Sequence, residues 1–342
     1  MAAGLLAWRP VRCVPLLLAW LVGPQPALAG VFSGPGELPD PMAWVERIQQ
    51  AAQQRNYAGT LVYTAGDVVS SSRVSRLGVG GQVYEHIEAL DGRQQRSFRR
   101  NDQVHTVWPA ARVVTVERRS AVDEALGLPQ LDPRVQGHYE LRWLGHEKIA
   151  GRDAAVLLLR PRDELRFAQR LWADKATGLL LRADVLSAQG QILESSAFSN
   201  IEIDTRATRD QMQNPARRLE GYRVITLSTE PTSLDAEGWT VERLPAGFRL
   251  LGCVQRPVGD LVDDTAARPG RALHAVFSDG LARVSVFIEA ADPARPRQAL
   301  MTHMGATHTL IKPRDSRWWI TVMGDVPTAT LRAFNDAVVR RP

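Results

Sequence analysis

The hydrophobic and polar positions of this chain predict one helix followed by many strands. Just after Asp40, apolar residues recur with the 3.6-residue period of one helix face: Trp44, Val45, Ile48, Ala51 and Ala52. Asp40 can cap this helix, and Pro41 suits its first position. After Asn56 the apolar residues follow a period of two, which is typical of strands.

Ten strand-like runs follow, separated by turn signals such as Asp91-Gly92 and Gln189-Gly190. The runs are 59–64, 73–77, 83–89, 104–108, 112–118, 139–144, 154–160, 166–173, 179–186 and 192–204. Short strands at this spacing behind one long helix predict a strongly curved antiparallel sheet. We therefore assign residues 40–204 to one mostly β domain.

Residues 205–221 are polar, rich in arginine and without either period, so we interpret them as a linker. Beyond them, residues 222–342 contain six further strand-like runs, at 239–243, 248–254, 271–278, 281–290, 306–311 and 317–323. Ser278-Asp279-Gly280 suits a tight hairpin turn. A helix starting near Pro327 would bury Leu331, Phe334 and Val338, which makes this second domain α+β.

The first 29 residues have the pattern of a secretory signal peptide. Arg9 and Arg12 precede an apolar run from Val14 to Val22, and Ala27-Leu28-Ala29 provides the small residues of a cleavage site. A short buried helix is the alternative, but four prolines in this stretch disfavour it. Cleavage after Ala29 would give an exported, soluble chain that begins with a glycine- and proline-rich flexible lead at residues 30–39. Gly30 stands where a lipoprotein carries its acylated cysteine, and we expect no membrane span.

Composition adds few constraints. The formal net charge is +5, and no basic cluster is interleaved with aromatic residues, so we expect no nucleic-acid partner. Cys253 is the single cysteine outside the signal peptide and lies in an apolar run, which predicts a buried, unreactive thiol and no internal disulfide.

Searches for catalytic chemistry find no motif. The seven histidines have no metal-ligand spacing, there is no G-x-S-x-G nucleophile motif, and the glycines at 78, 80 and 81 precede a strand instead of a phosphate-binding helix. We therefore predict no catalytic residue, metal site or cofactor, and expect that the protein is not an enzyme.

Aromatic and arginine residues suggest binding instead. Aromatic residues on or beside the first domain's strands could line the apolar concave face of the sheet, and four are candidates for contact with a lipid: Tyr63, Trp108, Phe167 and Trp172. In the second domain, Arg314, Arg317 and Trp318 are candidates for contact with a partner protein. Ordinary core packing is the favoured explanation of the aromatic residues in both groups.

Several sequence strings resemble the MucB/RseB family, periplasmic regulators of the sigma-E envelope stress response. In order, they include Asn56-Tyr-Ala-Gly-Thr-Leu-Val-Tyr63, Arg170-Leu-Trp172, Thr177-Gly-Leu-Leu-Leu181, Leu244-Pro-Ala-Gly-Phe248 and Phe277-Ser-Asp-Gly-Leu-Ala-Arg-Val-Ser-Val-Phe-Ile-Glu289. The resemblance covers nearly the whole chain after the signal peptide. It departs from the family pattern at Arg166-Phe-Ala-Gln169 and at Gly324-Asp325.

The resemblance implies a large N-terminal domain similar to the lipoprotein carriers LolA and LolB, an unclosed curved sheet covered by helices, and a smaller C-terminal partner-binding domain. It also implies a negative regulator that binds the periplasmic domain of an RseA/MucA-like anti-sigma factor and shields it from a DegS-type protease. Lipopolysaccharide or acyl chains would release that partner. The alternative is a periplasmic lipid or lipoprotein carrier of the LolA/LolB type. The sequence leaves the oligomeric state open, including a homo-oligomer.

Overall fold

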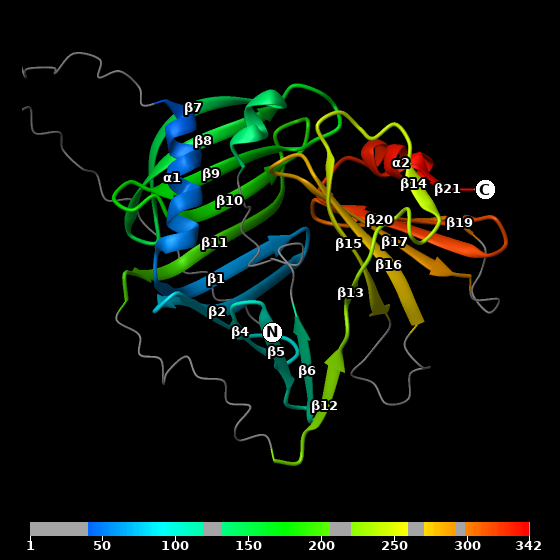
Figure 1. Cartoon of the computed structure of the whole chain (residues 1–342). Helices are drawn as coiled ribbons and strands as arrows, with labels where there is room; N and C mark the ends of the chain where they lie inside the picture. The colour runs from blue at the N-terminus through cyan, green and yellow to red at the C-terminus, as the bar shows by residue number, and fades with distance from the viewer. Residues whose placement is uncertain (1–39, 119–131, 206–219, 259–269, 292–297, 342) are drawn as a thin grey trace, which may run out of the picture. The chain divides into compact units, whose positions relative to one another are not determined.

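The computed structural model describes residues 40–118, 132–205, 220–258, 270–291 and 298–341 (Figure 1). The predicted signal peptide, the flexible lead and nearly all of the predicted linker lie outside these described residues. The predicted α+β architecture is confirmed: one large, unclosed, mostly antiparallel sheet, covered by α-helix α1 and a short 3-10 helix, is followed by a smaller part with its own sheet and helix.

Helix α1 (Pro41–Gln54) begins as its sequence predicts. The Asp40 carboxylate accepts a hydrogen bond from the backbone nitrogen of Met42 at 3.0 Å, and Pro41 occupies the first turn. Trp44, Val45 and Ile48 of this helix are buried against the large sheet. The apolar period of the sequence therefore marks the face on which the helix packs.

The first sheet has twelve strands in the order β12-β6-β5-β4-β3-β2-β1-β11-β10-β9-β8-β7. Their bounds are β1 (Tyr57–Ala65), β2 (Val68–Val79), β3 (Gln82–Ala89), β4 (Arg96–Arg100), β5 (Gln103–Trp108), β6 (Val113–Arg118), β7 (Tyr139–Ile149), β8 (Arg152–Pro161), β9 (Ala168–Asp174), β10 (Leu180–Leu186), β11 (Ile192–Ile203) and β12 (Arg223–Leu227). A short 3-10 helix, η2 (Pro133–Gly137), precedes β7. Two consecutive meanders, β1–β6 and β7–β11, meet at the pairing of β1 with β11.

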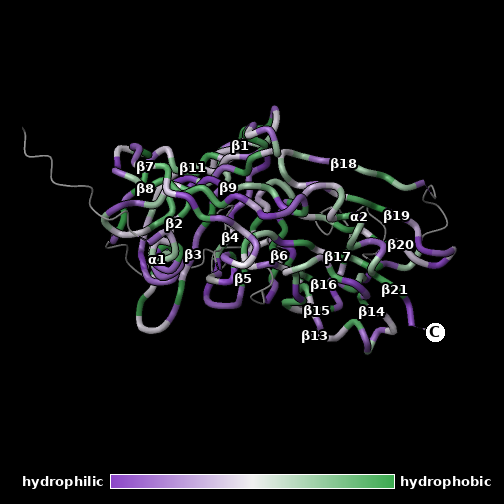
Figure 2. Tube along the Cα trace, turned by 90° about the horizontal axis from the view of Figure 1, so that it is seen from above, coloured by the Kyte–Doolittle hydropathy of each residue, from purple (hydrophilic) through white to green (hydrophobic). Residues whose placement is uncertain are grey.

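The second sheet has seven strands in the order β13-β15-β16-β17-β20-β19-β18. Their bounds are β13 (Glu230–Pro231), β15 (Arg249–Val258), β16 (Gly270–Ser278), β17 (Arg283–Ala290), β18 (Leu300–Met304), β19 (Thr307–Arg314) and β20 (Trp318–Gly324). Helix α2 (Thr328–Ala337) and the two-stranded pair of β14 (Trp239–Val241) and β21 (Val338–Arg340) complete this part. Figure 2 shows β18 along the outside of the sheet beside β19.

Several features differ from the sequence prediction. Strand β4 was not predicted because Arg96-Ser-Phe-Arg-Arg100 presents one apolar residue among polar ones, although Phe98 is buried. Strand β18 was not predicted because all five of its residues are exposed at the sheet edge. Strand β12 falls within the range assigned to the second domain, yet it pairs in parallel with β6 of the first sheet. The first sheet therefore extends beyond the predicted linker to Leu227.

Each sheet has its own hydrophobic core. The first is centred on α1 and includes Leu157, Leu159 and Leu171. The second lies between the seven-stranded sheet and α2, and includes Phe277, Leu331 and Phe334. Leu331 and Phe334 are buried on α2, as the periodicity of the last helix predicted. Val338 is buried too, but as the first residue of β21, because the helix ends one residue earlier than predicted.

Candidate functional site

A buried ion pair joins the two sheets. Arg166, in the connection between β8 and β9, donates from Nε to Oδ2 of Asp279 at 2.5 Å, and both side chains are completely buried. Its other guanidinium nitrogens contact the Asp163 carboxylate and the carbonyl of Ala246. Tyr139 donates its hydroxyl to Asp279 Oδ2 at 3.1 Å. We call Arg166, Asp279, Asp163 and Tyr139 the inter-sheet junction.

The turn between β16 and β17 positions the aspartate of this junction. Asp279 Oδ1 accepts from the backbone nitrogens of Leu281 and Ala282, at 2.9 and 2.8 Å, so both carboxylate oxygens are satisfied. Gly280 has a φ of +107°, and its carbonyl accepts from the backbone nitrogen of Asp132 at 3.0 Å. The predicted hairpin turn is thus also the place where the second sheet contacts the segment that leads into β7.

Burial controls the protonation of the junction tyrosine. Burial, and after it the negative charge of Asp279, raises the pKa of Tyr139 well above its usual value. The hydroxyl therefore stays protonated and donates to Asp279. A polar group buried in this way is stabilising only while its partners stay in place, so the junction favours one arrangement of the two sheets.

A second contact lies at the turn between β18 and β19. Gly305, with a φ of +58°, approaches β1 and β11 so closely that a Cβ at this position would lie 2.7 Å from Cβ of Ala65 and 2.9 Å from the carbonyl oxygen of Leu193. The next residue, Ala306, donates its backbone N–H to the Glu194 carboxylate, to which the Tyr63 hydroxyl also donates. The turn therefore places backbone of the second sheet directly against side chains of the first.

Glu194 titrates abnormally in this second contact. Burial, followed by the negative charge of Asp325, raises its pKa to about 7. Its Oε2 atom is buried and has no hydrogen-bond partner among the described residues. A carboxyl group in this setting holds a proton more tightly than an exposed one, so the contact is sensitive to pH near neutrality.

Three of the four predicted lipid-contacting residues lie on the α1 face or at its junction with the second sheet. Leu61 of β1 packs with Ala51 of α1. Because side chains alternate between the two faces along a strand, the observed registers from β1 to β5 place Tyr63 and Trp108 on the same face of the sheet as Leu61. Phe167 lies beside His308 of β19, with ring centroids 5.7 Å apart. These three side chains are half-buried.

Trp172 does not join them. It alternates with Leu171 and Ala173, which face α1, and so points to the opposite side of the sheet, where it is buried with Ala154 and Val156. Its indole nitrogen donates to Glu147 Oε2 at 2.8 Å. The structure thus brings Trp172 into the core and away from the other three aromatic residues.

The three predicted partner-contacting residues differ in accessibility. Arg314 donates from Nη2 to the carbonyl of Asn335 in α2 at 2.6 Å, so its guanidinium is held against the helix. Arg317 is exposed in the turn before β20. Trp318 is half-buried, with its ring perpendicular to that of Trp239 and centroids 5.5 Å apart.

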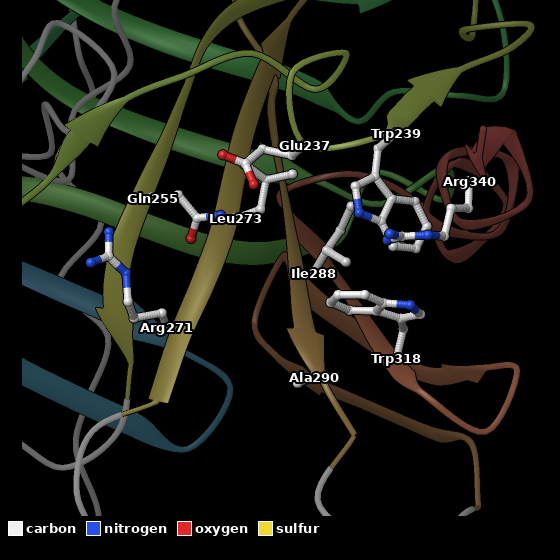
Figure 3. A pocket seen from close by; sticks show the side chains of 9 residues that line it. All are labelled: Glu237, Trp239, Gln255, Arg271, Leu273, Ile288, Ala290, Trp318 and Arg340. Carbon is white, nitrogen blue, oxygen red and sulfur yellow. The ribbon is translucent and has the colours of Figure 1, made fainter. Parts of the chain in front are cut away.

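Trp318 also lines a cavity of about 500 Å³ in the C-terminal part (Figure 3). Its lining residues are Glu237, Trp239, Gln255, Arg271, Leu273, Ile288, Ala290, Trp318 and Arg340. Arg340 lies over both indole rings, 5.3 Å from the Trp239 centroid and 4.7 Å from that of Trp318. The two perpendicular tryptophan rings and the arginine that covers them therefore form one wall of the cavity.

Other sequence predictions concern single residues. Cys253 is buried, as predicted, and burial, with Glu237 adding negative charge, raises its pKa to about 11. Within the described ranges, no group of three or more histidine, cysteine or acidic side chains is arranged to hold a metal ion. The described chain also has no helix with the length and apolar character needed to cross a bilayer.

The main polar contacts are not apparent from local sequence patterns. Asp279 was assigned only to a turn, Arg166 was noted only as a departure from the family pattern, and Glu194 was not considered. The one available signal was Asp279 within a buried apolar string, where an unpaired charge is costly.

Comparison with known proteins matches both parts of the chain to one family. The sequence model of the MucB/RseB N-terminal domain matches residues 40–216, and that of the MucB/RseB C-terminal domain matches residues 233–339. The sigma factor AlgU regulatory protein MucB of Pseudomonas aeruginosa is 29% identical over 299 residues, covering 85% of this chain and 88% of the relative. The sigma-E factor regulatory protein RseB of Escherichia coli K12 is 23% identical over 298 residues, covering 86% and 89%.

A solved structure shares the fold over the same length. The crystal structure of MucB in complex with MucA(peri) is 27% identical to this chain, has a TM-score of 0.66, and covers 89% of this chain and 100% of that one. The similarity therefore includes both sheets.

Proposed function

Because the chain belongs to the MucB/RseB family, we propose that it is a periplasmic negative regulator of sigma-E signalling that binds the periplasmic domain of an RseA/MucA-like anti-sigma factor. The observation that carries this proposal is the family match across both domains, together with relatives named as sigma factor regulatory proteins over 85% or more of this chain. The complex of MucB with MucA(peri) supports the class of partner. In this proposal residues 1–29 direct export and are removed after Ala29.

We further propose that the protein acts by binding alone, shielding its partner from a DegS-type protease until lipopolysaccharide or an acyl chain releases it. A lipid can release the partner only if it binds the free regulator more tightly than the complex. Tyr63 on β1 and Phe167, just before β9, support this coupling because both neighbour the second sheet. Tyr63 donates to the carboxylate that Ala306 also contacts, and Phe167 lies beside His308. In this proposal, a lipid that contacts either aromatic ring alters the packing of β19, or of the turn that precedes it, against the first sheet.

A protection assay tests the regulator proposal. The chain beginning at Gly30 is mixed with the periplasmic domain of the anti-sigma factor, and cleavage of that domain by the protease is followed with and without lipopolysaccharide. We expect slow cleavage that lipopolysaccharide accelerates. Absence of binding or of protection would overturn the regulator, and transfer of an acylated protein to an acceptor without protection would support a LolA/LolB-type carrier.

The contribution of the predicted contact residues to partner binding is tested with separate variants. We propose Arg317 as a direct contact because it is exposed, whereas Arg314 is held by α2 and Trp318 is half-buried in the cavity wall. Arg317→Ala should weaken partner binding, and Arg93→Ala, at an exposed arginine in the connection between β3 and β4, serves as the matched control. Equal affinity of the two variants would exclude Arg317 from the interface.

A further inference from the structure

The cavity of the C-terminal part has two chemically different ends. Leu273 and Ile288, both buried, form an apolar floor between them. Figure 3 shows Trp239, Trp318 and Arg340 at one end and Glu237, Gln255 and Arg271 at the other. A volume of about 500 Å³ is within the range of small-molecule sites, which are commonly apolar with a few oriented polar groups.

The polar groups at the two ends differ in whether they already have partners. At the second end, Glu237 accepts from the Thr232 hydroxyl at 3.0 Å, and Arg271 pairs with Glu230 at 3.0 Å. At the tryptophan end, Arg340 is exposed and has no ion pair with any described carboxylate, and the indole nitrogen of Trp318 is buried without a hydrogen-bond partner in the described chain. This end of the cavity therefore combines a solvated guanidinium with a buried indole N–H that has no acceptor.

A buried indole N–H without an acceptor is energetically costly, because the group loses its bond to water and gains none. A carboxylate would satisfy both groups, since its oxygens accept from a guanidinium and an N–H at the same time. An ammonium group would not suit this end, because Arg340 already covers the two ring faces that would attract a cation.

We propose that this cavity is a binding site for a small carboxylate with an apolar body. The carboxylate lies at the tryptophan end and accepts from Arg340 and from Nε1 of Trp318, and the apolar body lies over Leu273 and Ile288. The site is separate from the face of the first sheet that carries Tyr63 and Trp108. Its lining residues lie on β14, β15, β16, β17, β20 and β21, except Glu237, which comes just before β14.

The test uses three eight-carbon probes on the unmodified protein: octanoate, octan-1-ol and octylammonium. Calorimetry gives the affinities, and ¹⁵N NMR follows the tryptophan indole N–H signals. Octanoate should bind at least about tenfold more tightly than the other two, which is the range of one charge-assisted hydrogen bond, and should shift one indole signal that is missing in Trp318→Phe. Equal affinities for octanoate and octan-1-ol, or binding that leaves this signal unmoved, would overturn the proposal.

Variants at the arginine separate recognition of charge from general packing. Arg340→Gln should lose octanoate affinity about tenfold while leaving octan-1-ol affinity unchanged. Arg332→Gln, at an exposed arginine of α2 outside the cavity, should change neither. Full octanoate affinity in Arg340→Gln would contradict the proposed role, and thermal unfolding of each variant verifies that its fold is intact.

Discussion

Arg166 and Asp279 are 113 residues apart in the chain, and their side chains meet in a completely buried ion pair that joins the two sheets. Burying an ion pair does not by itself stabilise a protein, because the desolvation of both charges offsets their attraction. Instead, each buried charge is tolerated only while the other is present. If the two sheets separated, the Asp279 carboxylate would lose its ion pair with the Arg166 guanidinium.

Replacing one member of this pair should therefore be costly. Arg166→Met leaves Asp279 buried beside Tyr139 without its cation, and we expect a loss of about 3–5 kcal/mol in the free energy of unfolding. Urea denaturation measures this value. Arg341→Met, which breaks the exposed pair with Asp235, should cost less than about 1 kcal/mol, and equal losses in the two variants would show that the buried pair is not special.

Gly305 should tolerate alanine less well than another glycine with the same backbone. Gly305 and Gly66 both have a φ of +58°, but a Cβ at Gly66 meets nothing within 4 Å, whereas one at Gly305 overlaps Ala65. Gly66→Ala should cost about 1 kcal/mol for the left-handed backbone alone, and Gly305→Ala about 1–3 kcal/mol more for overpacking. If both variants lost the same free energy of unfolding, the turn at Gly305 would not be closely packed against β1.

Glu194 should make the folded state less stable as the pH rises toward neutrality. Its pKa in the folded state, about 7, lies above the ordinary value of 4.5, so the folded state binds its proton more tightly than the unfolded state. Its stabilising contribution is complete below about pH 4.5 and is lost as the pH rises through about 7. Unfolding measured from pH 4 to 8 should show this slope, Glu194→Gln should remove it, and Glu202→Gln, an exposed carboxyl of the same strand, should retain it.

His274 should have the opposite effect at lower pH. Burial, and then the positive charge of Arg256, lowers the pKa of His274 to about 4. Its ring stacks on Phe287 with centroids 4.1 Å apart, and Nε2 lies 3.1 Å from the Ser285 hydroxyl. Since the unfolded state binds this proton more tightly, stability should fall as the pH drops from about 6.5 to about 4. NMR titration of the His274 ring should give a midpoint near 4, and a midpoint near 6.5 would disprove the burial.

Cys253 should react slowly while the protein is folded. Its thiol is buried and its pKa is raised to about 11, so little thiolate is exposed at neutral pH. A maleimide or disulfide reagent should label the denatured chain far faster than the native one. Equal labelling rates would contradict the position of Cys253 in the second core.

The sequence predicted what depends on periodicity and missed what depends on long-range contact. The cap at Asp40, the buried face of α1 and the turn at Asp279 follow from local spacing, and all three are present. Trp172 shows the limit of this reasoning, because an aromatic residue on a strand points to one face or the other according to register, which no local pattern reveals. Arg166 shows a second limit, because its partner comes from the other sheet.

The strand order of the first sheet has a consequence for how the chain folds. Strands β1–β6 pair with their neighbours in sequence, and so do β7–β11, so each meander needs only short loops to close. The two are joined through β1 and β11, where Tyr57 lies opposite Ile203. This pairing closes a loop of well over one hundred residues, and its entropic cost makes it the natural slow step of folding. A substitution that weakens the β1–β11 register should therefore slow refolding more than it speeds unfolding, whereas a substitution within either meander's outer hairpins should do the reverse.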